Sequence, residues 1–300
     1  MSIVNLVAQG ALLGGYYALL ACGLSLMFGV MRIINLAHGD LAVLGAFLVF
    51  VISDYFNISP FLALVAVLPI MAAVGWLMQR GMLERSLRSG MLVPLLATFG
   101  LSIAVENLLF EAYGADTRSL APMIGDLAFD SLEVSNQLSI SYLAALIFAL
   151  AVALLGGLSL FLKHTSLGRA IRATAEDADT AELVGVNSRS VYAIAAAIAV
   201  ATAGLAGTML AMRATFDPYS GPMQLIFAFE AVVIGGIGSL WGTLLGGIVL
   251  GLAQSIGATF DPRWFLLAGH LTFLAILGGR MFNEWARARG GLRSSLGFWR

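Results

Sequence analysis

Long uncharged segments dominate the pattern of hydrophobic and polar positions along the chain. Residues 3–31 carry no charged side chain, and residues 55–79 repeat this pattern. About 20 consecutive apolar residues are enough for an α-helix to cross the ~30 Å hydrocarbon core of a bilayer. Each of these segments is therefore predicted to be a membrane-spanning helix, which leaves most of the charged residues to the loops.

The other gaps between charges predict further spans. A second span is expected to begin near Asn35 and to include His38 and Asp40. Later single spans are predicted at residues 89–112, 134–162, 190–212 and 264–279. Residues 218–260 are too long for one span and are expected to form two short or broken helices. The predicted total is about eight crossings, if each takes about 20 residues. The number of crossings within 218–260 stays open.

Glycines interrupt that long segment and recur elsewhere at four-residue spacing. Gly235, Gly236 and Gly238 make a poor helix interior, because each glycine costs about 1 kcal/mol relative to alanine. A break at membrane depth is tolerated only inside protein or beside a water-filled cavity, and such breaks often line transport sites. The spacing of Gly10 and Gly14 favours ordinary close helix packing instead. The glycines as a group are therefore open to two interpretations, a helix break beside a transport site and ordinary helix packing.

Composition excludes several classes of protein. Hydrophobic residues make up 60% of the 300 residues and charged residues 11%, whereas about 25% of a typical soluble domain is charged. This excludes an ordinary soluble enzyme, a disordered chain and a nucleic-acid-binding protein. The apolar runs also exceed the alternating strands of about ten residues that build a membrane β-barrel. We therefore expect an all-α, polytopic bundle of transmembrane helices in a lipid bilayer, forming a single domain over residues 1–300.

Positive charge marks one side of the predicted bundle. The chain has 16 lysine and arginine residues. Apart from Arg118, Arg213 and Arg263, they lie at Arg32, in the loops 80–88 and 163–189, or in the C-terminal segment 280–300. Loops rich in lysine and arginine stay in the cytoplasm. The sequence therefore predicts a cytoplasmic C-terminus with a basic tail at 281–300. It also predicts an external N-terminus, provided that the glycine-rich region crosses an even number of times.

A few ionisable side chains lie within the predicted spans. Such residues are costly in a bilayer and usually face the protein interior or a cavity. Asn35, His38 and Asp40 precede an apolar run, so they would either cap the helix there or line a translocation pathway. Glu106 and Glu230 suit a protonated or hydrogen-bonded structural role as well as a role in transport.

The segment from Ser166 to Asn187 differs from the spans because it is alanine-rich, charged and too polar to cross a bilayer. It predicts one or two short helices. Asp179 and Glu182 fit an N-cap residue and its N3 carboxylate, and Gly185 is placed to end a helix in a left-handed conformation. The small alanines would allow close docking against another protein. A solvated or membrane-surface connector would have the same composition.

Three sequence blocks resemble known transport proteins. Ser166–Asn187 resembles the cytoplasmic loop of ABC-importer permeases that contacts the ATPase. Arg32–Gly45 (RIINLAHGDLAVLG) and Phe227–Gly251 (FAFEAVVIGGIGSLWGTLLGGIVLG) resemble the early and late motifs of LivH-type permeases of branched-chain amino acid importers. The early block favours this subunit over its LivM-type partner. The departures from the pattern, at Leu36 and Trp241, are minor.

The resemblance implies one subunit of a heteromeric importer in the bacterial inner membrane. A LivM-like second permease subunit, two cytoplasmic ABC ATPase subunits and a periplasmic or extracellular solute-binding protein would complete it. ATP and Mg would bind to the ATPases, because this chain has one lysine and no phosphate-binding loop. The chain itself is expected to bind no cofactor and to be no enzyme. The implied function is translocation of branched-chain or related hydrophobic amino acids by alternating access. Urea, short amides and other small organic solutes are the alternative substrates.

These interpretations assign roles to individual residues. The expected ATPase-coupling positions, within the loop 163–190, are Gly168, Arg169, Arg172, Ala173, Asp177, Ala181 and Gly185. The expected positions of the translocation pathway or the helix break are Asn35, His38, Asp40, Glu106, Glu230, Gly235, Gly236 and Gly238. The rival class is an ion-coupled secondary carrier or a channel, since the two glutamates would suit proton coupling. A membrane enzyme is disfavoured because the three histidines are scattered without metal-ligand spacing.

Overall fold

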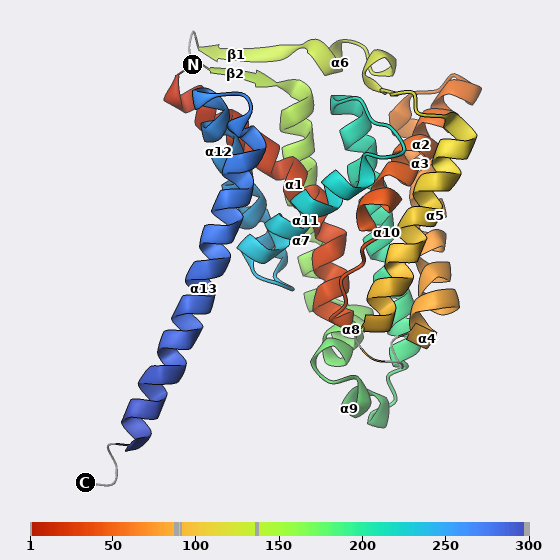
Figure 1. The fold of residues 1–300 in the computed structure, drawn as a ribbon. Coiled ribbons are helices and arrows are strands. Elements are labelled where there is room, and N and C mark those ends of the chain that lie inside the picture. Colours follow the sequence, from red (N-terminus) through yellow and green to blue (C-terminus); the bar gives the residue numbers. More distant parts are fainter. Residues whose placement is uncertain (1, 87–89, 91, 136–137, 297–300) are drawn as a thin grey trace.

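A computed structural model of the chain describes residues 2–86, 90, 92–135 and 138–296, with the backbone alone at 134–135 and 286–296. This part of the chain is a bundle of long apolar helices (Figure 1). The long helices are α1 (Ile3–Met31), α2 (His38–Phe56), α3 (Pro60–Met78), α5 (Leu92–Tyr113), α7 (Tyr142–His164), α10 (Ser188–Arg213), α12 (Leu240–Phe260) and α13 (Trp264–Leu296).

Shorter elements connect these helices. They are a π-helical turn (Gln79–Leu83) that continues α3 into α4 (Glu84–Ser86), a 3-10 turn (Ala121–Met123), α6 (Asp126–Phe129), the antiparallel strands β1 (Ser131–Ser135) and β2 (Leu138–Ser141), α8 (Ser166–Glu176), α9 (Ala178–Leu183) and α11 (Gly221–Gly235). Figure 1 places the β-hairpin, α6 and the N-terminus at one end of the bundle and α8 and α9 at the other. We call these the hairpin end and the α8–α9 end.

The described helices confirm the predicted fold class. Eight of them are long and apolar enough to cross a membrane, so the chain is a multi-pass membrane protein. The long segment 218–260 divides into two helices, as predicted. The first of these, α11, has 15 residues, fewer than the about 20 that span a bilayer at a normal orientation.

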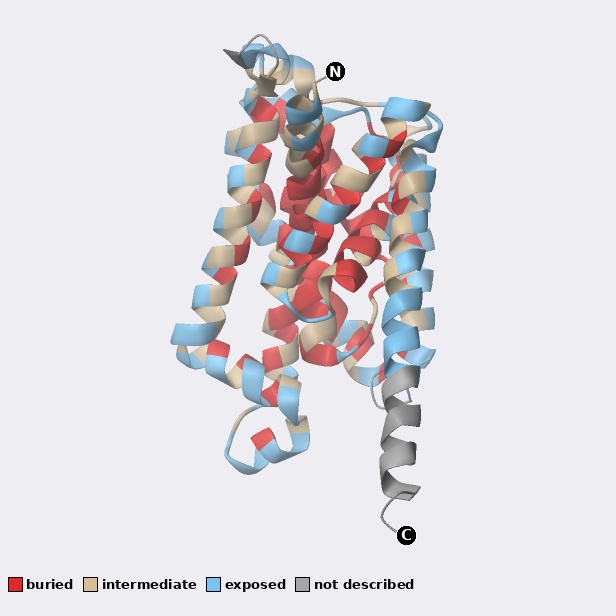
Figure 2. Ribbon diagram, turned by 90° about the vertical axis from the view of Figure 1, so that its left-hand side faces the viewer, coloured by how far each residue is buried: buried red, intermediate tan, exposed pale blue. Residues whose placement is uncertain are grey.

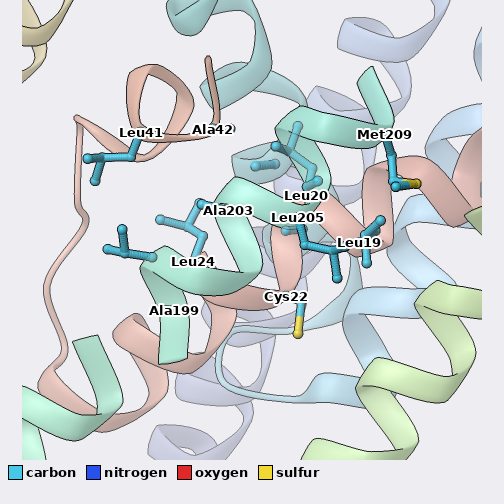
Figure 3. Close-up of a cluster of buried hydrophobic side chains, with 14 of the residues drawn as sticks. Leu19, Leu20, Cys22, Leu24, Leu41, Ala42, Ala199, Ala203, Leu205 and Met209 are labelled. Atoms are coloured by element: carbon cyan, nitrogen blue, oxygen red, sulfur yellow. The ribbon is translucent and has the colours of Figure 1, made fainter. Parts of the chain in front are cut away.

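Helix α1 is the centre of the bundle. Of the residues in its most hydrophobic 18-residue stretch, 83% are buried, and the helix packs against α12, α10, α7 and α11. Figure 2 shows this buried core inside a ring of helices that expose one face. In Figure 3, Leu20 and Leu24 of α1 lie in one cluster with Leu41 of α2 and Ala203 of α10. A helix that is apolar on every side suits such a position, because none of its sides has to meet water.

Glycines allow α1 and α12 to approach each other closely. A methyl group on Gly14 would overlap the backbone of Gly247 and Ile248, and one on Gly251 would overlap the backbone of Gly10. Helix association in lipid depends on such close contacts, because the hydrophobic effect contributes little there. The structure therefore confirms the packing interpretation of the four-residue glycine spacing between these two helices.

The glycine break lies where the sequence predicts it. Helix α11 ends at Gly235, and the next glycines, Gly236 and Gly238, have φ angles of +100° and +80°. Residues with a side chain rarely adopt these angles, so glycine is required at both positions. Ser239 then caps α12, because its hydroxyl accepts a hydrogen bond from the amide of Gly242 at 3.1 Å.

Two predicted boundaries are wrong. Residues 138–141 belong to the β-hairpin and not to a span, since polar and apolar residues alternate there and Ile140 pairs with Leu132. A search for uncharged runs cannot detect that alternation. Helix α2 begins at His38 rather than near Asn35, and its N-cap residue Ala37 has no capping side chain. Helix α13 continues into the predicted basic tail. Residues 297–300 of this tail and its side chains from 286 onward lie outside the described part of the chain. Arg88, in the loop after α4, also lies outside it.

Candidate coupling surface and membrane-depth sites

Helix α8 begins at Ser166, separated by one residue from the end of α7. Its N-cap is Thr165, whose hydroxyl accepts a hydrogen bond from the amide of Gly168 at 2.9 Å. Gly168 is buried, and a methyl group at this position would overlap the backbone of Phe161 and Leu162. Ile171 is buried on the same helix. Helix α8 is therefore held firmly against the membrane-spanning bundle.

Asp177 caps the next helix, α9. Its carboxylate accepts hydrogen bonds from the amides of Asp179 at 3.0 Å and Thr180 at 3.1 Å, and from the Thr180 hydroxyl at 2.7 Å. These donors lower the pKa of Asp177, the Thr180 hydroxyl most of all, so the carboxylate is ionised at neutral pH. The prediction that Asp179 is the N-cap, with Glu182 at N3, is wrong. The backbone is still extended at Asp177 and already helical at Asp179.

Replacing Asp177 with alanine is expected to fray the first turn of α9, because two backbone amides lose their acceptor. Replacing it with asparagine is expected to preserve α9, since the amide oxygen can accept the two backbone bonds that Oδ1 accepts now, although the bond from the Thr180 hydroxyl to Oδ2 is lost. Hydrogen–deuterium exchange of residues 178–184 in the purified protein measures this difference. Faster exchange is expected in Asp177→Ala than in Asp177→Asn, and equal rates in the two variants would contradict the capping role.

The tip of α9 presents two large apolar side chains to the surroundings. Leu183 is 86% exposed and Val184 is 78% exposed. The next residue, Gly185, has a φ angle of +89° and ends the helix in the left-handed conformation that the sequence predicts. A contiguous exposed apolar pair at the end of a capped helix favours a protein-docking role. The sequence analysis missed this pair, whose signal is an adjacent leucine and valine at the end of an otherwise charged segment.

The predicted coupling residues divide into two groups. Gly168 and Ala181 are buried and pack the two short helices against their neighbours. The others are exposed, and we call them, together with the apolar pair at the tip of α9, the α8–α9 surface: Arg169, Arg172, Ala173, Asp177, Leu183, Val184 and Gly185. The structure thus brings the predicted positions onto one protruding element, and their role in coupling stays a prediction.

A cavity of about 1390 Å³ lies beside α8, and we call it the α8 cavity. Its walls come from α1 and the loop after it, the start of α5, the end of α7, one side of α8, and the start of α12 with the loop that precedes it. Gly238 of the glycine break lines this cavity, and so do Ile171 and Arg172 of α8. The break therefore borders a cavity that also contacts one of the predicted coupling residues.

The polar residues of the early motif are buried at membrane depth. The side-chain oxygen of Asn35 accepts a hydrogen bond from a backbone amide two residues later at 3.1 Å. His38 Nε2 lies 2.8 Å from the carbonyl oxygen of Leu20, and the Ser102 hydroxyl donates to Asp40. None of the three motif residues lines the α8 cavity. These contacts favour a structural role, and a role in the translocation pathway stays a prediction.

Glu106 lies at the edge of the buried face of α5, one turn after Ser102 and near enough to Asp40 for the two carboxylates to interact. It is half-buried, and the neighbouring Asn107 is exposed and donates to the carbonyl of Ile103 at 2.8 Å. Phe110 and Tyr219 contact each other near the hairpin end of this face, with ring centroids 5.6 Å apart. A carboxylate and an amide that face lipid are costly. This face of α5 is therefore expected to meet water or another protein.

Two contacts fasten α13 to the end of α11. Glu230 is buried, and its carboxylate lies 2.5 Å from His270 Nδ1, a pairing over 40 residues that the sequence did not indicate. Arg280 donates to the carbonyls of Val233 at 2.6 Å and Ile234 at 2.6 Å. A cation at a helix C-terminus satisfies carbonyls that lack an intrahelical partner. The helix that precedes the glycine break is therefore tied to the last span.

These features are those of a polytopic helical membrane protein with two short helices projecting at one end. The family model of the permease component of branched-chain amino acid transport systems matches residues 6–277. The chain belongs to this family.

Relatives agree with the family assignment. The high-affinity branched-chain amino acid transport permease BraD of Pseudomonas aeruginosa is 33% identical over 263 residues, which cover 84% of this chain and 85% of the relative. LivH of Escherichia coli K12 is 30% identical over 261 residues, with coverages of 84% and 85%. LivM of the same organism is 28% identical over 283 residues, which cover 87% of this chain and 66% of the relative. No solved structure matches the chain significantly.

Proposed function

We propose that the chain is the LivH-type membrane subunit of an ATP-driven importer of branched-chain amino acids. The α8–α9 surface carries this proposal, because it offers an exposed apolar tip on two capped helices for an ATPase that the chain itself lacks. The branched-chain amino acid transport of BraD and LivH supports the substrate class. The weaker match to LivM supports pairing with a second, related permease subunit. Two cytoplasmic ATPases, which bind ATP and Mg, and an external solute-binding protein would complete the importer.

The α8–α9 end would face the cytoplasm of a bacterial inner membrane. Lys163, Arg169, Arg172 and Arg189 lie in or beside the short helices at this end, as the excess of positive residues in cytoplasmic loops requires. Figure 1 places the C-terminus at the same end and the N-terminus at the other. This arrangement supports an external N-terminus and a cytoplasmic C-terminus.

Coupling would work through the α8 cavity. ATPase closure would displace α8, and because α8 and Gly238 line the same cavity, the displacement would change the space between α8 and the glycine break. Binding of ATP can shift the permease between two conformations only if the ATPase contacts the α8–α9 surface differently in each. The translocation pathway would run along the face of α5 that carries Glu106, and the second permease subunit would form its other wall. Polar side chains on this face would then line the pathway instead of facing lipid.

Uptake of labelled leucine by cells that express the complete importer tests this function. Uptake is expected to stop when ATP is depleted and to persist when a protonophore collapses the proton gradient. The contact between the buried Glu230 and the partly exposed His270 favours the rival, a proton-coupled carrier. The reverse pattern, in which the protonophore alone abolishes uptake, would establish that rival. Uptake of urea or short amides in place of leucine would retain the ATP-driven class and change the substrate.

A further inference from the structure

The α8 cavity has a character that amino acid transport does not explain. Its volume of about 1390 Å³ exceeds the roughly 300–1,000 Å³ typical of small-molecule pockets. Large apolar side chains from five helices and two loops form most of its wall, including Leu26, Leu95, Leu162, Ile171 and Trp241. A zwitterionic amino acid would leave most of this apolar surface uncovered. The interior suits hydrocarbon chains.

Positive charge gathers on the same wall. Arg32, Lys163 and Arg172 line the cavity, and Glu176 is the one acidic residue in the lining. None of the three cations forms an ion pair with an acidic residue in the part of the chain that the structure describes. An apolar cavity with an excess of unpaired cations complements an anionic amphiphile.

The depth of the cations fits a lipid headgroup. Arg32 directly follows the last residue of α1, and Lys163 is the penultimate residue of α7. Both side chains therefore lie where spanning helices end, which is the level of the phosphates in the adjacent leaflet. Basic pockets between transmembrane helices at this level bind anionic headgroups, and each cation near the surface contributes about 1 kcal/mol, or roughly fivefold in affinity.

We propose that the α8 cavity binds one anionic phospholipid from the leaflet at the α8–α9 end. Its phosphate is held by Arg32, Lys163 and Arg172, and an acyl chain fills the apolar interior. The bound lipid contacts α8 and the glycine break together. It thus becomes part of the packing between the docking element and the spans. This inference concerns lipid binding and does not depend on which solute is transported.

Native mass spectrometry of the full chain in nanodiscs tests the proposal with phosphatidylglycerol and phosphatidylcholine as probes. We expect wild-type protein to retain phosphatidylglycerol in preference to phosphatidylcholine. Arg32→Gln and Lys163→Gln are each expected to weaken this retention about fivefold, and the double variant about 25-fold. Arg169→Gln is the matched control, because this nearby arginine is exposed like the other two residues but does not line the cavity.

A second variant tests the apolar interior. Ser159→Phe places a large side chain in the cavity wall and keeps all three cations, so it is expected to reduce phosphatidylglycerol retention while the protein stays monodisperse. Equal retention of the two lipids, wild-type retention in the double variant, or an equal loss in Arg169→Gln would overturn the headgroup assignment. Unchanged retention in Ser159→Phe would overturn the acyl-chain assignment. Displacement of the lipid by leucine would assign the cavity to the transported solute instead.

Discussion

Leu183→Glu is expected to abolish ATP-coupled uptake while the protein stays folded in the membrane. Leu183 is 86% exposed, so the substitution removes no internal packing. If the tip of α9 inserts into the ATPase, the carboxylate would be buried there without a partner. Loss of a central apolar contact at an interface costs about 2 kcal/mol or more, which is roughly 30-fold in affinity. Val184→Glu is expected to act in the same way.

The measurement is leucine uptake together with co-purification of the ATPase. Glu182→Gln is the matched control, since Glu182 is the exposed residue directly before Leu183 and its change adds no buried charge. The control is expected to behave like wild type. Normal uptake and normal ATPase recovery in Leu183→Glu would show that the α9 tip does not dock the ATPase.

Gly247→Leu is expected to destabilise the whole bundle. Even the first carbon of a side chain at this position would lie against the backbone of Gly14 and Ala18 in the central helix. Helix α1 is buried on all sides, so it cannot move away without disturbing its other contacts. Overpacking of a well-packed core costs roughly 1–3 kcal/mol and occasionally more. Loss of folded protein or a clear drop in melting temperature is the expected result.

Gly157→Leu provides the matched comparison, because a Cβ atom added at Gly157 of α7 would meet no neighbouring atom within 4 Å. Fluorescence-detected size-exclusion chromatography after heating compares the two variants in detergent. Gly157→Leu is expected to melt close to wild type. If both variants lose stability equally, the close approach of α1 and α12 is not what requires glycine at 247.

The spans could be predicted from the sequence because charge is excluded from lipid over about 20 residues at a time. The glycine break could also be predicted, because three glycines in four residues disfavour a helix. The positive φ angles of Gly236 and Gly238 explain why glycine occurs there. The hairpin at 131–141 could not, because an absence of charge is common to strands and helices. Local caps were ambiguous for a similar reason: Asp177 and Asp179 are both suitable residues, and only the course of the backbone distinguishes them.

The candidate sites were less predictable because they depend on contacts between distant residues. Nothing in the sequence joins Glu230 to His270 or Arg280 to the end of α11, since these pairs form only when α13 packs beside α11. Exposure of Leu183 likewise depends on how α9 projects from the bundle. The resemblance to ABC-importer permeases predicted which segment docks the ATPase, and the structure distinguishes the buried residues of this segment from the exposed ones.

The most direct test of the proposed coupling is ATP hydrolysis by the reconstituted importer. Proteoliposomes would contain this chain, a LivM-type subunit and the two ATPases, with leucine-loaded or empty binding protein added outside. The account predicts that the leucine-loaded binding protein stimulates hydrolysis with the wild-type chain and fails to do so with Leu183→Glu. Hydrolysis that responds to leucine equally in both, or that never responds with the wild-type chain, would contradict it.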